Sequence, residues 1–249
     1  MKVLPSICII FEEDKLHLGI KNERVRFILF SVYIIFVALM NTIIVEGGKD
    51  MGNRIYPIGI QNFEKIRKEG YVYVDKTALM YKLVKSGSYY FLSRPRRFGK
   101  SLLISTLEAY FEAKRDLFEG LAVETLEKDW VKRPVFHLDL NIGKYDTPDS
   151  LDKILNETLD YWESLYGTRS AETTLALRFA GVVGRAYEQS GERVAILIDE
   201  YDKPLLQAIG NEELQREFRN TLKPFYGVLK TMDGCIKFAL LTGVTKFGK

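Results

Sequence analysis

The chain has 249 residues, of which 47% are hydrophobic and 28% charged, so it can bury a sizeable core and is not an intrinsically disordered protein. Its formal net charge of +3 is too small to indicate a nucleic-acid-binding protein. The cysteines Cys8 and Cys235 and the histidines His17 and His137 lack metal-ligand spacing, which excludes a zinc site of the usual kind. So few cysteines suit a reducing compartment, and we expect a cytoplasmic location.

The first part of the chain differs from the rest, and we expect an N-terminal extension (1–50) ahead of one main domain (51–249). Residues 27–45 carry no charge and are long enough to span a membrane. The basic residues before them and the acidic residues after them would keep the N-terminus inside and send the main domain outside. Two interpretations stay open, an inner-membrane anchor through 27–45 or upstream sequence ahead of a natural start at Met51.

Helical and strand-like patterns alternate along the main domain. Helical spacing predicts helices at residues 63–68, 79–86, 102–113, 151–166, 171–189 and 212–229. Short apolar runs predict strands at residues 71–74, 89–92, 135–140, 194–198 and 236–241. This alternation predicts a three-layer α/β fold with a mainly parallel sheet and helices on both faces. Few residues follow the last predicted strand, so we expect the sheet to be incomplete at the C-terminus.

A short apolar run, a basic turn and a helical pattern follow one another over residues 89–103. A phosphate needs free backbone N–H groups, a helix N-terminus behind them and a cation in front. Gly99 allows the backbone to approach closely, Lys100 would reach the β- and γ-phosphates, and the Ser101 hydroxyl would bind Mg²⁺. Arg94 stands where the usual pattern has glycine. Residues 94–101 therefore form a predicted phosphate loop that is unusually stiff and positive.

A second polar site follows the fully apolar run 194–198, which is typical of a buried parallel strand. Such a strand delivers its last side chains to the carboxyl edge of the sheet. Asp199 would hold Mg²⁺ there, and Glu200 would polarise a water for attack on a γ-phosphate. A solvated acidic turn with no ligand is the other interpretation of this pair.

A third strand-like run ends at Thr242, just before Gly243. In P-loop ATPases with an additional strand, the strand between the loop strand and the acidic strand ends in a polar residue that senses the γ-phosphate. Thr242 fits that place, although a threonine that caps a turn would look the same.

Taken together, these motifs resemble those of the predicted AAA-ATPase-like family of bacteria, many of whose members also carry a nuclease-like C-terminal domain. The resemblance spans about residues 55–249, and the arginine-rich form of the predicted phosphate loop is itself characteristic of that family. The shared motifs lie at residues 56–59, 63–66, 73–77, 94–101, 198–204 and 241–247.

The resemblance implies a doubly wound P-loop NTPase sheet, ATP and Mg²⁺ as cofactors, and ATP hydrolysis. It implies catalytic roles for Lys100, Glu200 and Thr242, with Ser101 and Asp199 as metal ligands. The alternative function is a nucleotide-gated interaction or regulatory module with little turnover, partnered with a C-terminal effector. The residues expected to contact the nucleotide are Arg94, Pro95, Arg96, Arg97, Phe98, Gly99, Lys100, Ser101, Leu102 and Asp75.

Two of these assignments have open alternatives. Asp75 precedes a helical pattern and could cap that helix or meet the base or ribose of a nucleotide. Arg96 and Arg97 could bind phosphates or an acidic partner, because guanidinium groups match phosphate geometry, or be solvated surface charge. ATP is the expected ligand, with a protein partner or self-association left open. The sequence gives no support for a nucleic-acid target, and a membrane could be reached only through 27–45.

Overall fold

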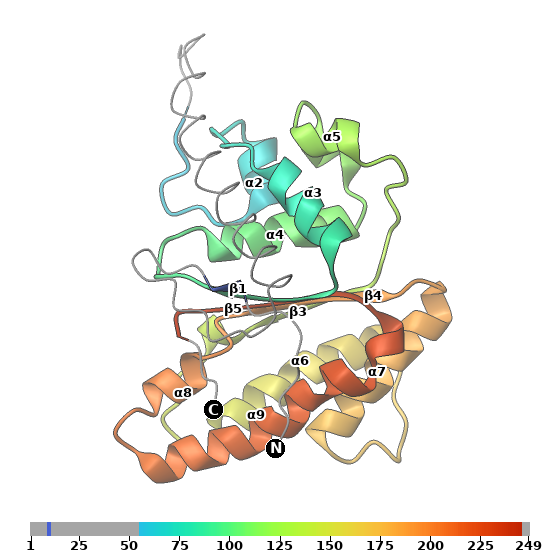
Figure 1. The fold of residues 1–249 in the computed structure, drawn as a ribbon. Helices are drawn as coiled ribbons and strands as arrows, with labels where there is room; N and C mark the ends of the chain where they lie inside the picture. The colour runs from blue at the N-terminus through green and yellow to red at the C-terminus, as the bar shows by residue number, and fades with distance from the viewer. Residues whose placement is uncertain (1–8, 11–54, 246–249) are drawn as a thin grey trace, which may run out of the picture.

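The computed structural model describes residues 9–10 and 55–245 (Figure 1). The apolar stretch 27–45 and Met51 lie outside these residues, so the structure does not bear on either interpretation of them. Within the described part of the chain, none of the helices combines the length and the apolar character that a membrane span requires.

One five-stranded sheet runs through the middle of the molecule, with the strand order β1-β2-β5-β4-β3 and every neighbouring pair parallel. Its strands are β1 (Ile9–Ile10), β2 (Tyr89–Ser93), β3 (Val135–Asp139), β4 (Val194–Asp199) and β5 (Ile236–Gly243). β5 is thus inserted between β2 and β4, as the additional-strand interpretation requires. The carboxyl ends of these three strands therefore meet at one edge of the sheet.

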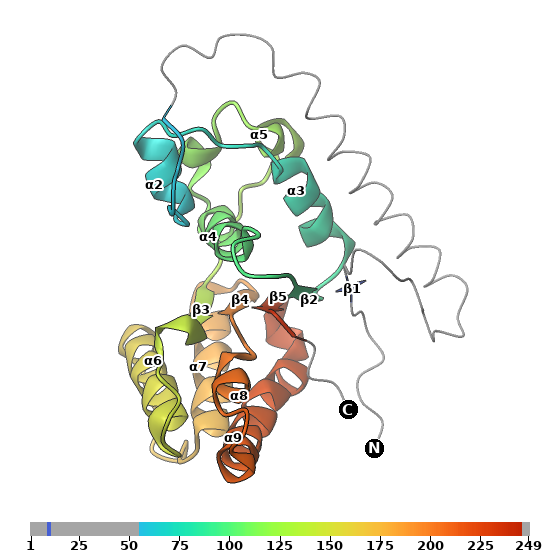
Figure 2. The same ribbon diagram turned by 90° about the vertical axis from the view of Figure 1, so that its left-hand side faces the viewer.

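Helices cover both faces of this sheet (Figures 1 and 2), which confirms the predicted α/β fold. One layer contains α2 (Phe63–Lys68), α3 (Thr77–Ser86), α4 (Lys100–Phe111) and α5 (Ala122–Leu126). The other contains α6 (Ser150–Tyr166), α7 (Leu175–Ser190), α8 (Lys203–Gln207) and α9 (Glu212–Thr231). Three short 3₁₀ turns complete the described elements, η1 (Arg115–Phe118), η2 (Leu140–Ile142) and η3 (Asp233–Cys235).

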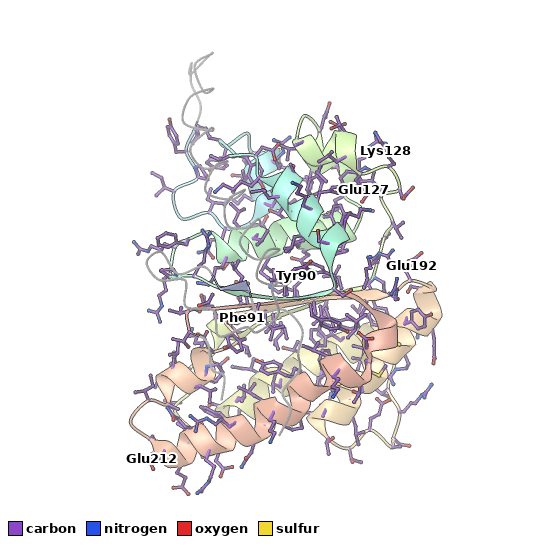
Figure 3. The ribbon with its side chains drawn as sticks, viewed as in Figure 1. Tyr90, Phe91, Glu127, Lys128, Glu192 and Glu212 are labelled. Atoms are coloured by element: carbon purple, nitrogen blue, oxygen red, sulfur yellow. The ribbon has the colours of Figure 1, made fainter. Side chains whose placement is uncertain are left out.

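The sheet divides the core into two apolar clusters. All six residues of β4 are buried, and successive side chains point to opposite faces. Ile196 and Ile198 join the cluster under α6, α7 and α9, whereas Leu197 joins the cluster under α3 and α4. Figure 3 shows the same alternation on β2, where Tyr90 and Phe91 leave the sheet on opposite sides. Burial on both faces explains why β4 reads as an uninterrupted apolar run.

The predicted strand at 71–74 is wrong, because residues 71–76 form no regular secondary structure. The alternating pattern has another cause. Tyr73 packs edge-on against Phe63 of α2 at 5.1 Å between ring centroids, and the Val72 N–H donates to Ile55 O at 2.9 Å. An extended segment that packs under a helix can thus show the same alternation of apolar residues as a strand. The short helices α5 and α8 have too few residues to show a helical period, and the sequence patterns missed them.

A buried carboxylate joins the helices of the α4 layer. Glu127 is 5% exposed, accepts a hydrogen bond from the Tyr110 hydroxyl and lies 2.9 Å from Lys85 Nζ. Its other oxygen accepts the backbone N–H groups of Lys128 at 2.9 Å and Asp129 at 3.1 Å (Figure 3). Burial alone would raise the pKa of Glu127, but the hydrogen bonds from Tyr110 and Lys85 outweigh it and lower the pKa to about 2.

We expect Glu127→Gln to destabilise the protein by about 2 kcal/mol at about pH 7, because it leaves Lys85 without its buried partner. The folded pKa of about 2 lies below the ordinary value of 4.5, so the folded state binds fewer protons between these two values. The stability from Glu127 is therefore fully present above pH 4.5 and is lost as the pH falls through about 2. Urea unfolding at several pH values measures both effects.

The control is Glu188→Gln, because Glu188 is 68% exposed and its nearest basic partner, Arg169, lies 3.9 Å away. It should change stability by less than about 0.5 kcal/mol at every pH. An equal and pH-independent loss in both variants would contradict the role given to Glu127.

Candidate functional site

The candidate site lies where β2 leaves the sheet and the chain turns into α4 (Figure 2). This is the carboxyl edge of a parallel sheet, where ligands of such folds usually bind. The predicted phosphate loop, the end of β4 and the end of β5 all reach this edge.

The predicted phosphate loop ends in a left-handed residue. Gly99 has φ of 75°, and α4 begins directly after it, two residues before the predicted start. A Cβ atom at Gly99 would meet no other atom within 4 Å, so the backbone conformation alone explains the glycine. Leu103 N–H donates to Gly99 O at 3.0 Å and closes the first turn. The earlier N–H groups of the helix have no carbonyl partner inside it and can meet an anion.

Lys100 lies folded against the site and is 5% exposed. Its Nζ donates to the carbonyl oxygens of Arg94 at 3.1 Å and Pro95 at 3.3 Å, and lies 3.1 Å from Glu200 Oε1. The predicted cation and the predicted water-activating carboxylate, 100 positions apart in the printed sequence, are therefore in direct contact.

Asp199, Glu200 and Thr242 form a compact polar set beside this lysine. The Asp199 carboxylate accepts a hydrogen bond from the Thr242 hydroxyl and, at 3.1 Å, from the Glu200 backbone N–H. Asp199 is 3% exposed and Thr242 is fully buried. Glu200 has φ of 53°, an uncommon conformation for a residue with a side chain, which turns the backbone sharply at the end of β4.

The rest of the predicted phosphate loop faces solvent. Pro95, Arg96, Arg97 and Phe98 are exposed, and Phe98 reaches 57% exposure. Arg94 is half-buried, and its backbone N–H donates to Gly243 O at 3.0 Å. The loop is thus fixed at its two ends, by β5 and by α4, while its basic centre lies on the surface.

Asp75 makes contacts that belong to helix capping. One carboxylate oxygen accepts the backbone N–H and hydroxyl of Thr77 at 2.8 and 2.7 Å, and the other accepts the Ala122 N–H at 2.7 Å. Asp75 therefore joins the start of α3 to the start of α5. Contact with a nucleotide base or ribose stays a prediction.

Two further residues near the site were missed by the sequence patterns. Asp139 ends β3 in register with Asp199, so both carboxylates lie on the α4 face of the carboxyl edge. The polar end of a strand-like run was the available signal. Lys76 is the other, and it lies near Arg94 of the predicted phosphate loop. Partial desolvation and the Arg94 guanidinium both lower the pKa of Lys76, because each disfavours its positive charge.

His137 is a partly buried residue of β3, and its Nδ1 lies 3.3 Å from Glu108 Oε2. Burial alone would lower the pKa of His137. The Glu108 hydrogen bond and the negative charges of Asp139 and Asp199 outweigh it and raise the pKa. The α4 face of β3 is therefore acidic next to the candidate site.

The donor groups at this edge fit Mg²⁺. A serine hydroxyl and a carboxylate are hard oxygen ligands, and Mg²⁺ commonly binds one or two of these together with waters and phosphate oxygens. Ser101 lies in the first turn of α4 and Asp199 at the end of β4, and both elements reach the carboxyl edge. Among residues 9–10 and 55–245, no group of three or more His, Cys, Asp or Glu side chains could hold a metal ion.

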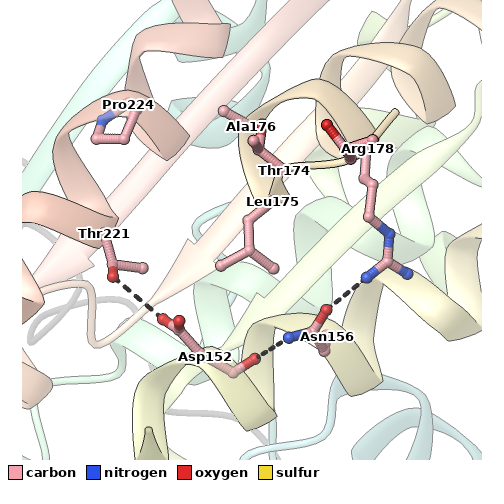
Figure 4. A pocket seen from close by; sticks show the side chains of 9 residues that line it. Asp152, Asn156, Thr174, Leu175, Ala176, Arg178, Thr221 and Pro224 are labelled. Atoms are coloured by element: carbon pink, nitrogen blue, oxygen red, sulfur yellow. Dashed lines mark hydrogen bonds between the residues drawn. The ribbon is translucent and has the colours of Figure 1, made fainter. Parts of the chain in front are cut away.

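A cavity of about 510 Å³ lies elsewhere, among α6, α7 and α9 on the opposite face of the sheet (Figure 4). Polar side chains on its wall bond to other groups of the protein. Arg178 bonds to Asn156 at 2.5 Å, Asp160 at 2.5 Å and Glu163 at 2.7 and 2.9 Å, and Asp152 accepts the Thr221 hydroxyl at 3.1 Å. These bonds join α6 to α7 and α9.

We expect Thr242→Val to cost about 1–3 kcal/mol of unfolding free energy, because it removes the hydroxyl donor from the buried Asp199 carboxylate. The matched control is Thr106→Val, whose hydroxyl donates to Leu102 O, a carbonyl inside α4. This control should cost less than about 1 kcal/mol, since no charged group loses a partner. Chemical denaturation of both variants measures the difference, and equal losses would contradict the importance of the Asp199–Thr242 contact.

Comparisons with known proteins identify the family of the chain. The family model described as "Predicted AAA-ATPase" matches residues 57–249. An "Uncharacterized protein in vnfD 5'region" of Azotobacter chroococcum mcd 1 is 41% identical over 201 residues, which are 80% of this chain and 39% of that relative. No solved structure matches the chain. Since the family match takes in the predicted phosphate loop, the end of β4 and Thr242, the chain belongs to the predicted AAA-ATPase family.

Proposed function

We propose that the chain binds Mg-ATP at the start of α4 and hydrolyses the bond to its γ-phosphate. Membership of the family suggests nucleotide binding or ATPase activity. The observation that carries the proposal further is the meeting of Lys100, Glu200, Asp199 and Thr242 at one edge of the sheet. A lysine at a helix N-terminus beside two carboxylates is the chemistry that phosphoryl transfer to water needs.

Each residue has a distinct task in this proposal. The N–H groups of the first turn of α4 and the Lys100 ammonium bind phosphate oxygens. Ser101 and Asp199 hold Mg²⁺, which neutralises charge on the phosphates. Glu200 orients a water molecule and accepts its proton as the water attacks. The Thr242 hydroxyl, which donates to Asp199, would turn its one hydrogen bond to the γ-phosphate when the nucleotide binds.

The ion pair between Lys100 and Glu200 makes hydrolysis depend on nucleotide binding. Lys100 Nζ lies 3.1 Å from Glu200 Oε1, so the lysine holds the carboxylate that would act on water. A γ-phosphate competes for the same ammonium group and releases Glu200. The base therefore becomes free when its substrate is in place.

The same ion pair supports a second candidate, a nucleotide-gated module with little turnover. If Glu200 stays with Lys100 after nucleotide binds, the site would report occupancy without hydrolysis. This chain spans 39% of the length of its curated relative, so an effector elsewhere in a longer protein is part of this candidate.

Two substitutions separate these functions. We expect Lys100→Ala to weaken Mg-ATP binding at least about tenfold, because it removes the cation from the phosphates. Glu200→Gln should bind Mg-ATP at least as tightly as the parent chain, since it removes the competitor for Lys100, and should lower kcat at least about 100-fold. Equilibrium binding and phosphate release measure the two effects.

The control is Lys153→Ala, a lysine 69% exposed and paired with Asp149 on the far side of the sheet, which should change neither quantity. Binding that is lost in Lys100→Ala, with no phosphate release by the parent chain, would favour the nucleotide-gated module. Full phosphate release by Glu200→Gln would reject Glu200 as the water-activating residue.

A further inference from the structure

The residues that follow β5 join the two halves of the candidate site. We call residues 243–245 the exit segment, because they carry the chain away from Thr242. The predicted phosphate loop bonds to the carbonyl groups on one side. Gly243 O accepts the Arg94 N–H at 3.0 Å, and Val244 O accepts the hydroxyl of Ser93, at the end of β2, at 3.0 Å. The exit segment is thus tied to the strand and loop that precede Lys100.

A buried carboxylate holds the other side of the exit segment. Asp202 is fully buried, and its Oδ2 accepts the backbone N–H groups of Val244 at 2.8 Å and Thr245 at 2.6 Å and the Thr245 hydroxyl at 2.8 Å. Hydrogen bonds to an ionised carboxylate are roughly twice as strong as neutral ones. Three such bonds to one oxygen hold Val244 and Thr245 against Asp202, and we call this contact the clamp.

Asp202 belongs to the same turn as the proposed water-activating residue. We call residues 199–202 the acidic turn. The Tyr201 N–H donates to Thr242 O at 2.8 Å, and the Tyr201 hydroxyl donates to Thr245 O at 3.0 Å. The acidic turn therefore bonds both to Thr242 and to the residues after it. In the sequence, Glu200 lies between β4 and Tyr201, which makes these bonds.

Gly243 of the exit segment packs closely against two side chains of the acidic turn. A Cβ atom on Gly243 would lie 2.6 Å from Asp202 Oδ1 and 2.7 Å from the Tyr201 ring. These distances are shorter than side chains tolerate, so glycine is required there by close approach. Each residue of the exit segment therefore lies close to Tyr201 or Asp202 of the acidic turn.

We propose that Asp202 is a positioning residue that fixes Glu200 and Thr242 relative to each other by clamping the exit segment to the acidic turn. The proposal rests on the proposed function, because Glu200 and Thr242 act on water and the γ-phosphate only there. Asp202 touches neither group. Its effect passes through the Val244 and Thr245 amides to the strand end that carries Thr242.

The first test needs no nucleotide. Amide hydrogen exchange of Asp202→Ala is compared with that of the parent chain. We expect exchange at Val244 and Thr245 to rise at least about tenfold, because their acceptor is removed. Exchange at Glu200 and Tyr201 should rise as well, since Asp202 holds the acidic turn, while β4 keeps its protection. Unchanged exchange at Glu200 and Tyr201 would overturn the proposal.

The second test uses two milder changes, which keep the proposal falsifiable if Asp202→Ala does not fold. Asp202→Asn keeps an acceptor oxygen without the charge, and Thr245→Val removes only one of the three donors. Both should keep Mg-ATP affinity within about twofold of the parent and lower kcat, with Thr245→Val the milder. A fall in stability with an unchanged kcat per binding site would show Asp202 to be structural only.

Gly243→Ala disturbs the same contact from the exit segment, because the new methyl group would displace Asp202 or Tyr201. It should lower kcat without loss of Mg-ATP binding, as Asp202→Asn does. The matched control is Gly227→Ala in α9, where a Cβ would meet no atom within 4 Å, and it should leave kcat unchanged. Full activity in Gly243→Ala would count against the proposal.

Failure of the proposed function has a different signature. If the parent chain binds no Mg-ATP or releases no phosphate, the proposed hydrolysis fails, and the exchange experiment still decides whether Asp202 positions Glu200. If the parent hydrolyses ATP and the exchange at Glu200 does not respond to Asp202→Ala, only the positioning role fails.

Discussion

The site depends on the parallel pairing of β5 with both β2 and β4. In this register, Thr242 lies next to Leu92 on one side, and its neighbour Leu241 lies next to Ile198 on the other. Three segments far apart in the sequence therefore end at the same height. Their polar side chains meet because the sheet aligns them, and the apolar clusters on its two faces hold that alignment. A slip of one residue would turn Thr242 away from Asp199.

The polar groups of the candidate site bond mainly to one another. Lys100 is paired with Glu200 and with two loop carbonyls, and Asp199 is paired with Thr242 and a backbone amide. An anion can enter only by exchanging partners with this network. Tight burial and exchangeable partners together suit a site that changes state when a phosphate arrives.

Local patterns in the sequence were enough to predict the fold, and several residues that they indicate as a site meet at one edge of the sheet. The apolar run of β4, the helical spacing of α4 and the glycine before Lys100 are all read over a few neighbouring positions. The strand at 71–74 could not be judged in this way, since an alternating pattern does not say whether a partner strand exists. The sequence patterns also missed Asp139 and Asp202. The strand register places Asp139 beside Asp199, and the contact of Asp202 with Val244 joins segments that are distant in the sequence. For Asp75, the contacts with Thr77 and Ala122 favour capping, which the sequence had left open.

Helix α4 begins at the candidate site and ends in the packed layer of helices. Lys100 begins the helix, and Tyr110, ten residues later and about 15 Å along the axis, bonds to Glu127. Damage to the first end need not unfold the second. A change at Lys100 is therefore expected to alter the carboxyl edge of the sheet while the packing around Tyr110 and Glu127 keeps the helix in place.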